Sequence, residues 1–405
     1  MSRKRSGCLG CSKYLIIILI IILIASFIIN GGLGDFSDKT VVSNKNNTVT
    51  PVAETFCFYY DQLNSTEKHI YDSLLAELKK GGLSCTINNI DYNTYAGAVN
   101  RACIALKYDH PEFFWINSGS SYSGQYGFGE NSDTINILLT CYQYWQYTND
   151  PQKYTDKLEA KVEEIAKKAD RQATEIEKVK YVHDYIVSNT IYDHDALAEA
   201  RKTFHNASSE YIYSAYGCLV DQKAVCAGYA FAFQMIMHEL GIPCTYIVGD
   251  AGGSHAWNLI TLDGKNYYID ATWDDGDYLD DHGNNKYDGN AEYDYFCITT
   301  NELTKTHTIS EEYFDIPTCT ATEYNYFEYY DYKLDYYSFN ELVNIINKQS
   351  NLDIICIQFA SKQELQKASK DLFDNYNWQN IPLLTQSKIS YSVDEDHLIL
   401  TFFRE

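Results

Sequence analysis

Positive charge is scarce in this chain of 405 residues. It has 32 lysines and arginines against 55 aspartates and glutamates, and the formal net charge is -23. Such a chain repels the phosphates of nucleic acids and of anionic lipids, so the composition argues against nucleic-acid binding. The apolar fraction of 45% and the charged fraction of 21% are those of a folded globular protein.

Metal-binding motifs are incomplete. Cys8 and Cys11 form a lone C-x-x-C, which is only half of a zinc site. The acidic stretch from Asp274 to Asn290 has many oxygen ligands of the kind that calcium prefers, but its spacing does not match an EF-hand and no glutamate closes the loop. We therefore predict no metal and no other cofactor, and we interpret this stretch as a solvated loop.

One apolar run near the N-terminus is long enough to cross a membrane. It extends from Tyr14 to Ile29, or to Leu33 with its small residues included. Basic residues precede it, which predicts a cytoplasmic N-terminus with the bulk of the chain outside the cell. A cleaved signal peptide is the alternative, although no clean A-x-A cleavage site follows. We predict an uncleaved, single-pass signal anchor in the cell membrane.

Changes in composition predict five segments. Residues 1–34 form the cytoplasmic stub and transmembrane anchor, and the polar residues 35–55 form a flexible linker. An N-terminal α+β domain follows over 56–150, then a central domain over 151–300 and a small C-terminal α/β module over 301–405. Ten cysteines follow the anchor; the sequence cannot assign pairs, and several are expected to be small buried apolar residues.

Local signals predict the main elements of the two flanking segments. Asn64 and Glu67 form a capping-box pattern, and Gly81-Gly82 stops the helix that follows. A Gly/Ser-rich loop is predicted over 118–129, before a strand over 133–145. In the C-terminal module the pattern predicts helices over 339–348 and 362–376 and strands over 352–359 and 397–403.

Residues 152–189 have apolar positions at helical spacing, which predicts two helices with a break near 169–174. His183 and Asp184 lie on the second helix. A metal or catalytic role is open to this histidine, but helix packing or surface exposure is the favoured interpretation.

Cys226 opens an apolar segment with a helical period, which Gly241-Ile242-Pro243 ends. At the N-terminus of a helix, free N–H groups and the macrodipole favour a thiolate. The same N–H groups can stabilise an oxyanion on an attacked carbonyl. A buried inert cysteine is the alternative when Cys226 is considered alone.

His255 and Asp270 change that balance. His255 follows a glycine-rich turn and opens an alternating run. Asp263-Gly264 predicts a hairpin turn, and the return strand, predicted over residues 266–271, carries Asp270. Counted outward from the turn, a small stagger brings the two side chains within hydrogen-bonding reach. Asp270 would then orient His255, and His255 would deprotonate Cys226.

These residues carry a family resemblance. AVCAGYA at residues 224–230, HAWN at 255–258 and IDATWDD at 269–275 resemble the catalytic core of the transglutaminase-like superfamily, and VHDYIVSNTIYD, which ends at Asp193, resembles the segment before its nucleophile. The resemblance covers less than a quarter of the chain. It implies an α+β, papain-like core with Cys226 as nucleophile, His255 as base and Asp270 as orienting acid.

The resemblance implies amide chemistry through a thioester, passed to water or to an amine. Because no amine-binding site is visible, hydrolysis of peptide or protein amides outside the cell ranks above cross-linking. Tyr192 and Gln222 are candidates for a second oxyanion donor. Trp257 and Trp273 are expected to pack around the site and keep it dry. A non-catalytic binding or scaffolding module of the cell envelope is the alternative from another class. Oligomeric state cannot be predicted.

Overall fold

The computed structural model describes residues 56–88, 95–125, 134–141, 151–202, 207–275, 278–279, 285–286, 291–386 and 388–404. The predicted anchor and linker, with Cys8 and Cys11, lie outside these ranges. In the part of the chain that is described, no helix combines the length and the apolarity needed to cross a membrane. The described residues all belong to one compact unit. The boundaries at 150 and 300 stay predictions.

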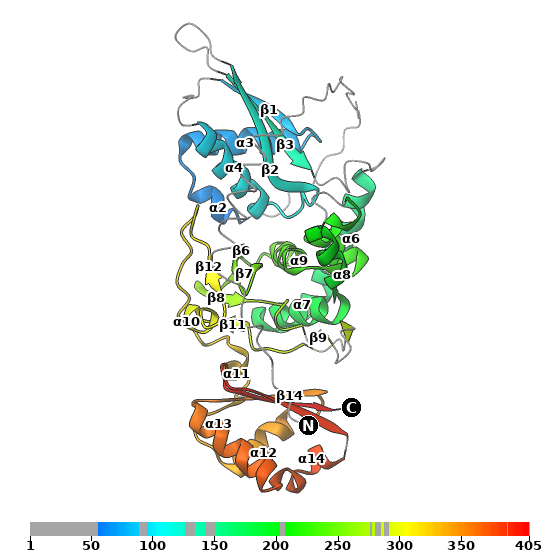
Figure 1. The fold of residues 1–405 in the computed structure, drawn as a ribbon, viewed down its shortest axis with the longest axis vertical. Coiled ribbons are helices and arrows are strands. Elements are labelled where there is room, and N and C mark those ends of the chain that lie inside the picture. The colour runs from blue at the N-terminus through cyan, green and yellow to red at the C-terminus, as the bar shows by residue number, and fades with distance from the viewer. Residues whose placement is uncertain are drawn as a thin grey trace. The chain divides into compact units, whose positions relative to one another are not determined.

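The first described elements are three helices and a three-stranded antiparallel sheet. The helices are α2 (Phe58–Asp61), α3 (Ser65–Leu78) and α4 (Tyr95–Asp109), and the strand order is β1 (Ser84–Asn88), β3 (Thr134–Cys141), β2 (Ile116–Gln125) (Figure 1). The predicted capping box is confirmed. Asn64 accepts hydrogen bonds from the N–H groups of Thr66 and Glu67, and Glu67 accepts one from the N–H of Asn64. This pairing satisfies donors that a helix start leaves free.

The Gly/Ser-rich loop predicted at residue 118 is wrong over its first part. Residues up to Gln125 continue β2 and pair with β3, for example Tyr122 with Ile137 and Ser123 with Asn136. The register shifts between Ile116 and Ser120, which marks an irregularity in the strand. Glycine and serine weaken the sequence signal for a strand, but the ladder is made by backbone groups that every non-proline residue carries.

A helical layer precedes the central sheet. α6 (Pro151–Ala169) and α7 (Glu175–Asn189) are separated at the predicted break, where a capping box at Thr174 starts the second helix. α8 (His194–Lys202), a 3₁₀ turn over 207–213 and a π-helical turn over 217–221 follow. The short strands β4 (Ile191–Tyr192) and β5 (Lys223–Ala224) pair in parallel just before α9 (Cys226–Glu239).

The central sheet has the antiparallel order β11 (Phe296–Ile298), β8 (Lys265–Ile269), β7 (Ser254–Leu262), β6 (Cys244–Asp250), β12 (Thr308–Ile309). Alternation along β7 gives the sheet two apolar faces. Ala256 and Ile260 belong to the large core that includes α6, α7 and α9. Trp257 and Leu259 belong to a smaller core on the other face, which the short helix α10 (Thr300–Leu303) helps to cover.

The last part of the chain forms a four-stranded sheet in the order β13 (Lys333–Leu334), β14 (Ile354–Phe359), β16 (Ile399–Arg404), β15 (Ile389–Asp394). β13 runs parallel to β14, and the other pairs are antiparallel. Figure 1 shows α12 (Phe339–Lys348) and α13 (Lys362–Ser369) on one side of this sheet. The sequence predicts α12, β14 and β16 with small boundary errors, but it misses β15, and the helix predicted over 362–376 ends as an α-helix at Ser369 and continues as a π-helical turn over 370–374. The other short elements of the described chain are α11 (Tyr326–Tyr329), α14 (Pro382–Thr385), β9 (Tyr278–Leu279), β10 (Asn285–Lys286) and a 3₁₀ turn over 377–380.

Gly249 is the close-packed point that lets β12 join the sheet. A Cβ at this position would lie 2.0 Å from the carbonyl oxygen of Thr308 and 2.6 Å from the Trp257 ring. We predict that Gly249→Ala lowers the free energy of unfolding by about 1–3 kcal/mol, the usual cost of overpacking. Urea denaturation measures this change.

Gly97→Ala is the matched control, because a Cβ there meets nothing within 4 Å on the exposed face of α4. It should leave stability unchanged or raise it by about 0.5–1 kcal/mol. Equal losses in the two variants would contradict the account of Gly249.

Candidate active site

Cys226 is the first residue of α9, as the sequence predicts. Val225 precedes it in an extended conformation, and its carbonyl accepts the first helical hydrogen bonds, from Gly228 N at 2.8 Å and Tyr229 N at 3.2 Å. The N–H groups of Cys226 and Ala227 come before these donors, in the half-turn that an α-helix leaves without intrahelical partners. The thiol is partly exposed. The Cys226 thiol is therefore accessible from solvent and lies at the positive end of the α9 helix dipole.

His255 and Asp270 are joined by the predicted hairpin. Asp263 and Gly264 form its turn with φ of 49° and 72°, and the register runs from Leu262 opposite Lys265 to Asn258 opposite Ile269. Asp270 is the next residue after this ladder, and His255 is three residues before its end. His255 Nε2 lies 2.6 Å from Asp270 Oδ2. The structure thus brings together the two side chains that the count predicted would meet.

The electrostatics of the pair favour a charged imidazole. Burial alone would lower the pKa of His255, but the charge of Asp270, its hydrogen bond and the Cys226 thiol outweigh burial and raise that pKa to about 10. Burial would raise the pKa of Asp270, but His255 and His307 hold it well below its usual range. Asp270 is 1% exposed, so its charge is little screened by water.

The Asp270 carboxylate accepts four hydrogen bonds. Oδ1 accepts from the N–H groups of Thr272 at 3.0 Å and Trp273 at 3.2 Å, while Oδ2 lies 2.6 Å from His255 Nε2 and 3.1 Å from His307 Nε2. Sequence reasoning missed His307. It lies 37 residues beyond Asp270, between α10 and β12, and its neighbours carry no motif that would have indicated this contact.

Aromatic rings enclose the imidazoles, as predicted for Trp257 and Trp273. The Trp257 ring is stacked on His255 with centroids 5.9 Å apart, and the Trp273 ring lies 6.1 Å from His255 and 4.6 Å from His307. Trp257 is buried and Trp273 is partly exposed. His255 is 8% exposed, so its interaction with Asp270 is little screened by water.

The two oxyanion candidates lie on the short strands before Cys226. Tyr192 in β4 is opposite Ala224 of β5, and the carbonyl of Gln222 accepts a hydrogen bond from Ile191 N at 2.9 Å. Tyr192 is partly buried, whereas Gln222 is exposed and has a left-handed backbone with φ of 57°. The pairing brings both residues close to the start of α9. Their role as donors stays a prediction.

The solvated-loop interpretation of the acidic stretch is wrong for its first two residues. Asp274 and Asp275 are buried. Asp274 Oδ2 lies 3.1 Å from His183 Nε2, and its Oδ1 accepts from Tyr295 N at 2.8 Å. Asp275 accepts a hydrogen bond of 2.6 Å from the Tyr229 hydroxyl. Specific donors compensate the burial of these charges. The remaining acidic residues of the stretch lie outside the described residues.

His183 is neither a surface residue nor a simple apolar contact. Its ring is fully buried between Asp274 and Asp184, with Nδ1 3.1 Å from Asp184 Oδ1. Burial alone would lower the pKa of His183, but the two carboxylates raise it to about 9. Burial raises the pKa of Asp274 to about 6 despite this partner. His183 therefore anchors the turn after Asp270 to α7.

In the described part of the chain there are two groups of three residues, and in each group the three possible metal-ligating atoms lie within 4.8 Å of one another. They are His255 with Asp270 and His307, and Asp294 with Asp394 and His397. In the first group, 2.6 Å between His255 and Asp270 is the length of a charge-assisted hydrogen bond. A metal there would need both imidazole nitrogens without protons. Hydrogen bonding accounts for the geometry of this group.

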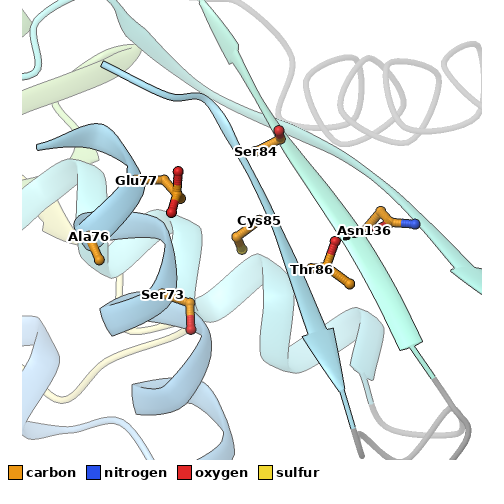
Figure 2. Close-up of a pocket in the computed structure, with 7 residues that line it drawn as sticks. All are labelled: Ser73, Ala76, Glu77, Ser84, Cys85, Thr86 and Asn136. Atoms are coloured by element: carbon orange, nitrogen blue, oxygen red, sulfur yellow. Dashed lines mark hydrogen bonds between the residues drawn. The ribbon is translucent and has the colours of Figure 1, made fainter. Parts of the chain in front are cut away.

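An open hollow of about 610 Å³ lies between α3 and the first sheet, away from these residues (Figure 2). Its lining includes the thiol of Cys85, with Glu77 on the facing helix. Burial, and then the charge of Glu77, raises the pKa of Cys85 to about 11. This thiol is therefore held protonated and is a poor nucleophile.

Comparison with known proteins matches residues 160–271 to the transglutaminase-like superfamily. This region includes Cys226, His255 and Asp270. The match covers less than a third of the chain, and it identifies residues 160–271 as a transglutaminase-like region. The expected α+β core is therefore correct. The superfamily region ends before Asp274 and His307.

Two relatives are the kyphoscoliosis peptidases of Mus musculus and Homo sapiens, 25% and 27% identical over 116 residues. That alignment covers 25% of this chain and 16% of each relative, so the chain spans only a small part of their length. Among solved structures, a transglutaminase is 22% identical with a TM-score of 0.27, over 38% of this chain and 44% of the other. A candidate cysteine protease of Cytophaga hutchinsonii is 16% identical with a TM-score of 0.24, over 38% and 62%.

The buried His183–Asp274 pair gives a stability prediction for this transglutaminase-like core. Asp274→Asn removes the negative charge beside a fully buried imidazolium, and we expect it to lower the free energy of unfolding by about 3–5 kcal/mol. Asp353→Asn is the control, because Asp353 is exposed, and it should change stability by less than about 0.5 kcal/mol. Urea denaturation at neutral pH measures both variants. A loss for Asp274→Asn no larger than that of the control would show that the pair contributes nothing.

Proposed function

We propose that this protein is a cysteine enzyme that acts on peptide or protein amides, with Cys226 as nucleophile, His255 as base and acid, and Asp270 as the residue that orients His255. The observation that carries the proposal is the buried His255–Asp270 pair, 2.6 Å long, beside a thiol at a helix N-terminus. A helix dipole and an imidazolium both stabilise a thiolate. A purely structural role seldom requires a cysteine thiol, a histidine imidazole and an aspartate carboxylate in one place.

The proposed reaction begins when the Cys226 thiolate attacks the carbonyl carbon of an amide. The N–H groups in the first turn of α9 stabilise the oxyanion that forms. The C–N bond then breaks, His255 gives its proton to the departing amine, and the acyl group remains on Cys226 as a thioester. Neutral His255 next takes a proton from the acceptor, which attacks the thioester and releases the Cys226 thiolate, so that the starting thiolate and imidazolium are restored.

We propose water as the acceptor in preference to an amine. Hydrolysis needs no second binding site, whereas cross-linking needs an amine held in place of water. The peptidase name of the two mammalian relatives is consistent with this choice. The basic residues and apolar run at the N-terminus support a location on the outer side of the cell membrane, with the anchor uncleaved.

The reactivity of Cys226 tests the proposal. An imidazolium whose pKa is about 10 stays charged through the neutral range, and with the helix dipole it favours a thiolate at Cys226. Alkylation at about pH 6 tests this, because an ordinary thiol of pKa ~8.5 is protonated there. We expect alkylation of Cys226 by iodoacetamide at this pH to be at least about 10-fold faster than that of a denatured thiol. In His255→Ala, the alkylation rate of Cys226 should fall to that of a denatured thiol.

Mass spectrometry of each cysteine measures these rates in one sample. Cys85 is the internal control, because its raised pKa predicts slow alkylation at the same pH. Alkylation of Cys226 no faster than that of a denatured thiol would end the enzyme proposal and favour a binding or scaffolding module. If Cys226 is alkylated fast, a second assay separates the two reactions. Release of ammonia or peptide indicates hydrolysis, and incorporation of a fluorescent amine indicates transfer.

A further inference from the structure

His307 is buried against the proposed site but comes from outside the superfamily region. Its imidazole is 2% exposed, and its ring lies 4.6 Å from that of Trp273, 5.1 Å from that of Trp257 and 5.4 Å from that of His255. The short strand β12, which starts at the next residue, holds this segment against β6. The position of His307 is therefore set by the central sheet.

The hydrogen bonds of His307 determine where its proton lies. Nε2 is 3.1 Å from Asp270 Oδ2, and an ionised carboxylate can only accept, so Nε2 carries the proton. Nδ1 is 2.8 Å from the Thr306 hydroxyl, which is in turn 3.1 Å from the Tyr295 hydroxyl. In the neutral ring Nδ1 accepts from Thr306, and Thr306 accepts from Tyr295. Hydrogen-bond donation thus runs in one direction, from Tyr295 through Thr306 and His307 to the Asp270 carboxylate.

Asp270 divides its charge between two imidazoles at one oxygen. Oδ1 is already held by two backbone N–H groups, which fix the plane of the carboxylate. A second donor on Oδ2 weakens the first, because both draw on the same negative charge. The other titratable groups that face this cluster are Cys226 from α9, Asp274 from the following turn and Tyr295 before β11.

We propose that His307 is a positioning residue, which orients Asp270 and takes part of its charge, so that His255 releases its proton more readily than if Asp270 served it alone. This role rests on the proposed function. An imidazolium held too tightly by its carboxylate is a poor acid for the departing amine. His307 then adjusts the acidity of His255 without touching the substrate.

The test compares His307→Leu with His307→Gln in the full chain. Leucine removes the donor, whereas the glutamine amide can place an N–H near the position of Nε2. We expect the alkaline inflection of Cys226 alkylation by iodoacetamide to rise by about one pH unit in His307→Leu, the scale of a lost hydrogen bond to a charged group. His307→Gln should shift it by less than half as much. Equal shifts in the two variants, or no shift in His307→Leu, would overturn the proposal.

Histidine NMR titration of His255 separates this proposal from the enzyme proposal, because it does not depend on thiol reactivity. If Cys226 alkylates fast but His307→Leu leaves the His255 titration unchanged, only the role of His307 is wrong. If Cys226 is alkylated slowly and the pH at which His255 titrates still rises in His307→Leu, the positioning role holds and the enzyme proposal fails. Should His307→Leu not fold, Thr306→Val removes the hydroxyl that faces Nδ1 and should shift His255 in the same direction by a smaller amount. No shift in that variant overturns the role.

Discussion

The Asp270 carboxylate is the group on which the arrangement of this core depends, because it is a buried charge with every acceptor position used. Its two oxygens accept from two backbone N–H groups and face two imidazoles. Removing any of these donors would leave a buried charge short of a partner, which costs more than a surface contact. The turn after β8, the start of β7 and the segment before β12 are therefore held together at one point.

The same turn is tied to the helical layer through a second buried pair. Asp274 lies four residues after Asp270 and meets His183 on α7, while Asp275 meets Tyr229 on α9. The helix that carries Cys226 and the hairpin segment that carries His255 and Asp270 are thus linked by polar contacts as well as by the apolar core. The N-terminal helices also join this unit, since the Tyr59 hydroxyl of α2 donates to the carbonyl of Tyr246 in β6 and Gln234 of α9 donates to the carbonyl of Tyr108 in α4.

Local signals in the sequence predict much of this arrangement. The hairpin register follows from the Asp263-Gly264 turn, and the helix starts follow from capping residues and from the break near 169–174. The contacts that sequence reasoning missed depend on tertiary structure. Burial of Asp274 and Asp275 depends on donors from α7, α9 and the segment before β11, and His307 reaches Asp270 only because β12 pairs with β6. No local pattern of charge or hydrophobicity encodes such distant partners.

The central proposal is that Asp270 keeps the imidazole of His255 charged beside Cys226, and that this charge favours the thiolate form of Cys226. Ultraviolet absorbance of the thiolate, taken as the difference between the wild type and Cys226→Ala, measures that ionisation directly. The account predicts a thiolate signal at about pH 6, below the range of an ordinary thiol, and its loss in Asp270→Asn. A signal that appears only at the pH of a free thiol, or one that is unchanged in Asp270→Asn, would contradict it.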